Sequence, residues 1–111
     1  MVHLVDSFKR KFSPERYEKD MELVKREDDP KKLVDIARYN VFPKVRLEAV
    51  RKISDGSVLV DIAQKDSNLN VRKEAIGKTD DIYVLAEISR KDSNRSIRKF
   101  ARNRLEELGY D

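Results

Sequence analysis

The chain repeats itself every 26 residues over most of its length. Residues 33–55 and 59–81 share 11 identical positions out of 23, and residues 59–81 and 85–107 share 9. Ordinary amino-acid composition would give about one or two identities by chance. A period of roughly 20 to 50 residues is typical of stacked units, each too small to bury its own apolar face. The repeat therefore predicts an array of such units and favours a binding surface over a reaction centre.

Each copy of the repeat predicts two short helices. Apolar residues in the first half recur at i, i+1, i+3 and i+4, which is a helical period. Those in the second half recur at i, i+4 and i+8 and form one narrow stripe with alanine at its centre. The residues that we expect to be buried are Ile36, Ile62, Ile88, Val45, Val71, Ile97, Ala49, Ala75 and Ala101.

Polar residues separate the predicted helices. The turns at 66–68 and 92–94 both read Asp-Ser-Asn, and such side chains bond nearby backbone groups, so they end one helix and cap the next. Ser57, Asp80 and Asp81 are expected to cap the helices that restart the cycle. Because no linker interrupts the period, the sequence predicts a single domain over residues 1–111.

The segment before the repeats predicts two further helices. Residues 2–12 carry Val5, Phe8 and Phe12 on one face, and Ser13-Pro14 starts a second helix that runs to about Glu27. We expect residues 1–29 to act as capping helices and residues 30–111 to form three repeats of 26-residue period.

Composition restricts the function classes that remain. Charged residues make up 41% of the chain and the net charge is +4. There is no cysteine, so thiolate chemistry and cysteine-bound zinc are excluded. His3 is the only histidine, and it has no second ligand at metal spacing. No glycine-rich phosphate loop is present, and no carboxylate pair stands out for acid–base work. The sequence predicts a non-enzyme with no catalytic residue, cofactor or metal.

The sequence also bears on location. It contains no apolar run of about 18 residues, which argues against a transmembrane helix. Its N-terminal apolar residues are interrupted by polar ones, unlike the core of a secretory signal. We therefore expect a cytoplasmic protein without a membrane partner.

The Val-Arg block of the second helix carries a family resemblance. It reads Val-Arg-Leu-Glu-Ala at 45–49, Val-Arg-Lys-Glu-Ala at 71–75 and Ile-Arg-Lys-Phe-Ala at 97–101. These columns resemble the HEAT-like repeats, including the short variety of the phycobilisome-lyase group. The resemblance implies an all-α fold, a right-handed α-solenoid, and relatives that range from scaffolds to chromophore-lyase partners and nucleic-acid enzymes.

The repeat unit departs from that family in its length. It is shorter than the usual HEAT-like unit, and this is similar to the leucine-rich variant repeats, in which one helix of each pair is tight. That resemblance leaves two alternatives for the first helix of each copy, which is either α-helical or partly 3₁₀.

Two sets of residues allow both a structural and a binding interpretation. Arg46, Arg72 and Arg98 could form a ladder for phosphates, but their repetition favours bonds to the turn or to an acid of the neighbouring copy. The aromatic turn around Phe42 could be a binding hot spot, but a cap that packs on the N-terminal helices is favoured. Tyr83 takes the same interpretation as Phe42.

The last copy has the strongest signal that is not explained by the fold. Residues 90–104 contain seven basic residues and one acid, Asp92. The candidate residues for a partner or a polyanion are Arg95, Arg98, Lys99 and Arg102. The sequence favours a non-catalytic module or scaffold that binds a protein partner through the face of its second helices. The alternative is binding of a nucleic acid or another polyanion through this basic patch, and the simplest interpretation of the patch is a solvated end.

Overall fold

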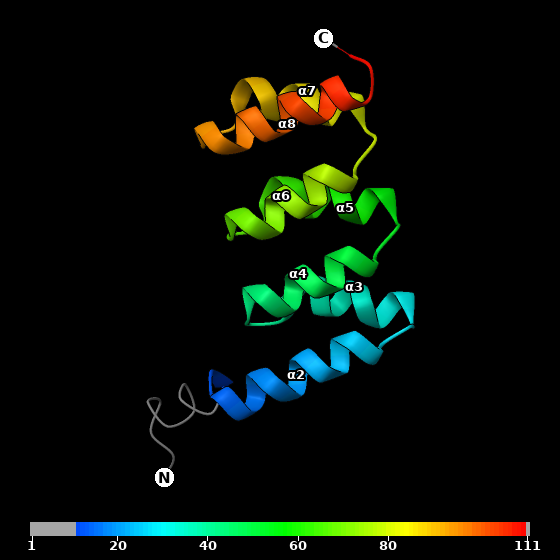
Figure 1. The fold of residues 1–111 in the computed structure, drawn as a ribbon, viewed down its shortest axis with the longest axis vertical. Helices are drawn as coiled ribbons and strands as arrows, with labels where there is room; N and C mark the ends of the chain where they lie inside the picture. The colour runs from blue at the N-terminus through cyan, green and yellow to red at the C-terminus, as the bar shows by residue number, and fades with distance from the viewer. Residues whose placement is uncertain (1–10, 111) are drawn as a thin grey trace. The chain divides into compact units, whose positions relative to one another are not determined.

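The computed structural model describes residues 11–110, and all regular secondary structure in that range is helical (Figure 1). None of the described helices is long and apolar enough to cross a membrane. The predicted all-α class is confirmed for this part of the chain. His3 and nearly all of the helix predicted over residues 2–12 lie outside the described residues. The described helices are α2 (Pro14–Arg26), α3 (Pro30–Tyr39), α4 (Pro43–Lys52), α5 (Gly56–Lys65), α6 (Leu69–Lys78), α7 (Ile82–Lys91) and α8 (Arg95–Glu107).

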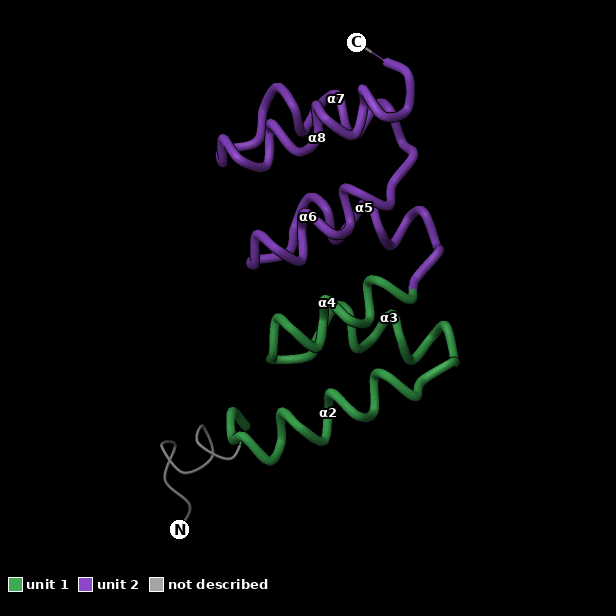
Figure 2. The backbone as a smooth tube through the Cα atoms, in the orientation of Figure 1, with its two compact units in different colours: residues 1–52 green, residues 53–111 purple. Residues whose placement is uncertain are grey.

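The helices fall into two compact units, residues 1–52 and residues 53–111 (Figure 2). In the first unit α3 pairs with α4, and α2 also packs against α4. In the second unit α5 pairs with α6, α7 pairs with α8, and α6 also packs against α8. Each unit therefore combines pairs within a copy of the repeat with one contact between helices a period apart.

An aspartate caps the first helix of each copy. Asp29 accepts a hydrogen bond from the Lys31 backbone N–H (2.9 Å), and Asp55 accepts one from Ser57 (3.0 Å). Asp81, one period further on, accepts from the backbone N–H of Val84 (3.1 Å). A carboxylate at this end also interacts favourably with the helix dipole. The helices that follow, α3, α5 and α7, are α-helical over ten residues each, so of the two alternatives for the first helix the structure has the α-helix.

The cap predictions were correct for Asp81 and wrong for Ser57 and Asp80. Ser57 lies inside α5, where its hydroxyl donates to Asp55 (2.7 Å). Asp55 takes the cap because its carboxylate reaches the first free N–H groups from the preceding position. Asp80 instead accepts from the guanidinium of Arg104 (2.8 Å).

The turns between the two helices of each copy share one hydrogen bond. Asn40 accepts from the backbone N–H of Phe42 (3.0 Å), and Asp66 and Asp92 accept in the same way from residues two positions on, at 2.8 and 2.9 Å. Asn68 and Asn94 then cap α6 and α8. The prediction that these polar turns end one helix and cap the next is confirmed.

The predicted buried stripe is confirmed with one exception. Ile62, Ile88 and the other expected positions of the second and third copies are buried, and the alanine column is fully buried, which lets helices approach closely. Ile36 is only half-buried, although Leu33 and Ala37 of the same helix are buried.

Of the two aromatic residues with a predicted capping role, Phe42 is packed and Tyr83 is exposed. The Phe42 ring packs edge-on against Tyr17 of α2, with 5.2 Å between centroids, and against Phe12 at 6.2 Å. Its predicted role as a cap on the N-terminal part is confirmed. Tyr83 is 83% exposed, so the same prediction is wrong there.

A basic residue near the end of α4 bonds the end of α2, and one near the end of α8 bonds the end of α6. The Lys52 ammonium donates to the backbone carbonyl of Glu27 at 2.5 Å, 25 residues earlier. Arg104 donates through Nε to the carbonyl of Thr79 at 3.1 Å, again 25 residues earlier. Glu27 and Thr79 are the C-caps of α2 and α6, so these cations satisfy carbonyl groups that a helix end leaves free.

Candidate interaction surface on the last helix

The four candidate residues of the basic patch all lie on α8, and we call them together the terminal basic face: Arg95, Arg98, Lys99 and Arg102. Arg95, Lys99 and Arg102 are exposed and follow the spacing i, i+4, i+7, which places them on one side of the helix. These three side chains make no hydrogen bond or ion pair with any residue in the range 11–110. Arg98 beside them is half-buried.

The opposite side of α8 fixes this orientation. Ile97 and Ala101 are completely buried, and Asn94 caps the helix by accepting from the backbone N–H of Ile97 (3.0 Å). Because a helix turns about 100° per residue, burying these two positions turns Arg95, Lys99 and Arg102 outward. The spacing i, i+3 and i+7 predicts that Arg95, Arg98 and Arg102 share one side, with Lys99 adjacent. In the structure the exposed set is Arg95, Lys99 and Arg102, and Arg98 is half-buried.

The register of the repeat shows that α8 has an arginine, Arg102, where the earlier helices have an apolar residue. Arg102 corresponds to Ile76 of α6, one period earlier, and further back to Val50 and Val24. Those three apolar residues are completely buried, whereas Arg102 is exposed. The last second helix therefore carries a charge at a position where the earlier ones carry a buried apolar side chain.

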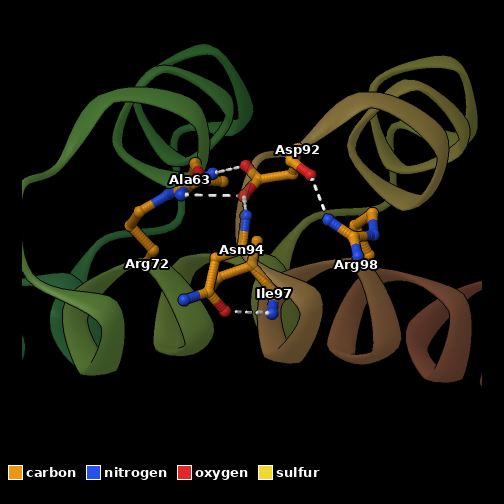
Figure 3. Close-up of polar contacts among 6 residues, drawn as sticks. All are labelled: Ala63, Arg72, Asp92, Asn94, Ile97 and Arg98. Atoms are coloured by element: carbon orange, nitrogen blue, oxygen red, sulfur yellow. Dashed lines mark hydrogen bonds and ion pairs between the residues drawn. The ribbon is translucent and has the colours of Figure 1, made fainter.

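Arg72, in the second unit, shows how the arginine column is used (Figure 3). Its Nε donates to the carbonyl of Ala63 (2.8 Å), while Nη1 donates to Oδ1 of Asp92 (3.3 Å) and Nη2 to Oδ2. Both side chains of this ion pair are only 10% exposed. Asp92 belongs to the turn of the following copy, so the guanidinium joins two successive copies, as the structural interpretation of this column predicted.

The Asp92 carboxylate is held in its charged form. Burial by itself would raise the pKa of Asp92. The hydrogen bond from Arg72, the backbone N–H of Asn94 and the charges of Arg72 and Arg98 outweigh burial and hold the pKa below its ordinary value. The contact is therefore an ion pair at neutral pH.

Arg98 is held in part by its own turn. Its Nη1 donates to the backbone carbonyl of Asp92 at 2.7 Å (Figure 3). In the first copy, Nη1 of Arg46 donates in the same way to the carbonyl of Asn40 (2.8 Å). Within residues 11–110, Arg98 forms no ion pair with a carboxylate. Its guanidinium is thus anchored at one nitrogen. Unlike Arg72, it makes no hydrogen bond to the Asp92 carboxylate, although its charge helps to lower the pKa of Asp92.

The remaining cation at the end of the basic stretch has a structural role. Arg104 bonds the Thr79 carbonyl, Asp80 and Glu107, the last at 3.2 Å. Its side chain is 19% exposed. Arg104 therefore does not belong to the terminal basic face, in agreement with its absence from the candidate residues.

A contact between Lys73 and Phe100 was not predicted from the sequence. The Lys73 ammonium lies 5.6 Å from the centroid of the Phe100 ring. This cation–π interaction joins α6 to α8. Phe100 is 40% exposed and replaces the glutamates at 48 and 74 in the earlier copies. That departure from an acidic column is the sequence signal that could have identified it.

A hollow of about 500 Å³ in the second unit is lined in part by Gly56, Ser57, Asp80 and Asp81. Its polar groups are engaged: Ser57 bonds Asp55, Asp80 bonds Arg104, and Asp81 caps α7. In the described range, no group of three or more His, Cys, Asp or Glu side chains is placed to hold a metal ion. The hollow is therefore a weaker candidate site than the surface of α8.

Comparison of the chain with family models, with curated proteins and with solved structures gave no match. The resemblance to HEAT-like repeats consequently stays a prediction that rests on the sequence columns themselves.

Proposed function

We propose that this chain is a non-catalytic interaction module whose copies stack as a short right-handed α-solenoid similar to the HEAT-like repeats. In this proposal it binds a protein partner through the surface of its second helices. The repeat supports the proposal because arrays of short helical units provide extended binding surfaces. The buried alanine column and the Arg72–Asp92 pair between successive copies are the contacts expected of such stacking.

The exposed apolar surface of α6 and α8 is the observation that carries this function. These two helices pack against each other, yet Leu69 and Phe100 remain 41% and 40% exposed. Aromatic residues are enriched in the cores of protein interfaces, and the exposed Phe100 ring carries the Lys73 ammonium beside it. We expect Phe100 to be the main anchor of a partner.

The test replaces Phe100 by the residue that the earlier copies carry. Phe100→Glu restores the acidic column, so the fold should tolerate it, whereas the anchor is lost. Tyr83→Ser is the matched control, because it also removes an exposed aromatic ring in favour of the residue found one period earlier. Affinity enrichment from the source cell, quantified by mass spectrometry, should lose a set of proteins with Phe100→Glu and retain them with Tyr83→Ser. Identical enrichment by the wild type and both variants would contradict the proposal.

A second candidate function is binding of a nucleic acid or another polyanion through the terminal basic face. It is favoured by Arg95, Lys99 and Arg102, which are exposed without an acid at ion-pair distance in the described residues. Binding of this kind weakens steeply with salt, and loss of each phosphate contact flattens the slope by about one unit. Salt titrations with and without a triple change of these residues to serine test it, and no binding at low salt would exclude it.

A further inference from the structure

We infer that the terminal basic face is a docking site for an acidic segment of a protein, and that Arg98 receives one of its carboxylates. The inference rests on the proposed function in that it assumes a protein partner, and it names a second contact region and the chemistry of that partner. The region differs from the surface around Phe100, so the two can be tested apart.

The pair of Arg72 and Asp92 is the template for this contact. Arg72 occupies the position one period before Arg98, and its guanidinium receives a carboxylate from the turn of the next copy. Arg98 is held by the backbone carbonyl of Asp92 at one nitrogen, which keeps it at the surface of the last turn. The remaining N–H groups of its planar fork suit a carboxylate, and no carboxylate of residues 11–110 is hydrogen-bonded to Arg98 or within ion-pair distance of it.

The three neighbouring cations extend the site along the helix. The axis rises by about 10 Å from the first of them, Arg95, to the last, Arg102. The cations lie on one side of α8 without a counterion among the described residues. Their mutual repulsion is relieved by a partner that offers several carboxylates along a comparable length. An apolar segment, by contrast, would bury Arg102 without a partner, which is costly.

The negative charge of Glu106, which follows Arg102 on the same side of α8, favours a protein partner over a nucleic acid. Glu106 follows Arg102 at i+4, is exposed, and continues the line of Arg95, Lys99 and Arg102. A phosphate backbone that tracks this line is negative throughout and meets the Glu106 carboxylate. A protein segment can place a lysine or arginine there, and its carboxylates can match the spacing of the cations.

The experiment uses the full chain and three fluorescent probes in low salt. One probe is an alanine-based helical peptide with glutamates along one face, the second has the same composition with the glutamates spread around the helix, and the third is an oligothymidylate of equal charge. We expect the one-face peptide to bind most tightly. Changing Arg95, Lys99 and Arg102 together to serine should weaken that binding about tenfold, since three exposed ion pairs are lost.

Two further variants separate geometry from net charge. Arg98→Lys keeps the charge but loses the fork, and it should weaken the one-face peptide about threefold. The combined change of Lys19, Lys31 and Lys44 to serine removes three exposed cations from α2, α3 and α4. It should leave the affinity within about twofold of wild type, because the inference assigns the contacts with the peptide to the cations of α8 and gives these three lysines no part in the site.

Three outcomes would overturn the inference. If the oligothymidylate binds more tightly than either peptide and loses this binding with the triple change on α8, the face serves a polyanion. If the two peptides bind alike and both triple variants weaken them equally, only net charge is at work. If no probe binds, the face is a solvated end. None of these outcomes affects the enrichment experiment on Phe100, so failure of the inference and failure of the proposed function are distinguishable.

Discussion

The side-chain amide of Asn40 donates a hydrogen bond to the carboxylate of Asp20, at 2.9 Å and twenty residues apart. Arg72 and Asp92 are also twenty residues apart and occupy the same two positions, two periods later. In the first pair the helix carries the acceptor and the turn the donor, while in the second pair the two roles are exchanged. In register and contact, α2 is therefore the second helix of an incomplete copy of the repeat.

Reversing the polarity of the first pair should test this equivalence. Asn40→Asp places a second carboxylate beside Asp20, which is buried. The change should reduce the free energy of unfolding by about 1–3 kcal/mol at neutral pH. Adding Asp20→Arg to it recreates the arginine–aspartate arrangement of the second unit and should recover part of the loss. Urea unfolding of both variants measures this, and a double variant no more stable than Asn40→Asp would contradict the equivalence.

The sequence columns predicted α3 to α8 but did not identify α2 as a copy. Val24 keeps the apolar column of Val50 and Ile76. Asp20, however, reverses the charge of the arginine column, and Leu23 replaces the small alanine and is 51% exposed. Identity is therefore low although the packing relation of α2 to α4 is preserved. The hydrogen bond between Asn40 and Asp20 is what shows that α2 is related to the second helices. The sequence does not show it, because either an acidic or a basic side chain on the helix can complete the polar pair with the turn.

The sequence predicted which residues form the candidate site, but not all of the contacts that they make. Periodicity was enough to place Arg95, Lys99 and Arg102 on one side, because Ile97 and Ala101 fix the inward side of the helix. That Arg102 stands where Ile76 is buried could also be read from the register. The arginine column predicted a bond from Arg72 to the turn or to an acid of the neighbouring copy, but the sequence could not single out Asp92, because other carboxylates of this highly charged chain were equally plausible partners.

The ion pair of Arg72 and Asp92 should make stability depend on acid pH. The pKa of Asp92 is lowered in the folded protein. Its contribution is therefore fully present above the unfolded pKa of about 4 and is lost as the pH falls through the folded pKa. Asp92→Asn keeps an oxygen that can accept from Asn94, as Asn40 does in the first copy, but it loses the charge. We expect it to reduce stability by about 1–3 kcal/mol at neutral pH.

The pH profile separates this pair from a loss of packing. Urea unfolding should show that the difference between wild type and Asp92→Asn shrinks as the pH is lowered from 7 to 3, because protonation removes the same charge from the wild type. The variant leaves Asn94 unchanged, so the cap of α8 is the same in both proteins. A difference that is constant across this pH range would mean that the charge of Asp92 does not contribute.

The exception in the buried stripe gives a matched pair of core variants. Ile62 is 4% exposed. Ile62→Ala should cost about 2–5 kcal/mol through lost burial and a residual cavity. Ile36→Ala removes the same atoms from a half-buried position and should cost clearly less, because solvent already covers part of the side chain. Thermal unfolding followed by circular dichroism compares them, and equal shifts in melting temperature would mean that the column does not define the core.

Gly77 offers a stabilising change in the same repeat. It lies inside α6, it is exposed, and a methyl group added at its Cα would meet no atom within 4 Å. Because glycine loses more backbone freedom on folding than alanine, Gly77→Ala should raise the free energy of unfolding by about 0.5–1 kcal/mol. Gly109 has equally open surroundings but a φ of 91°. Alanine adopts that conformation only with strain, so Gly109→Ala should destabilise the end of α8 instead. The two variants should therefore shift the melting temperature in opposite directions, and a fall with Gly77→Ala would show that glycine is needed there for a reason other than the helix backbone.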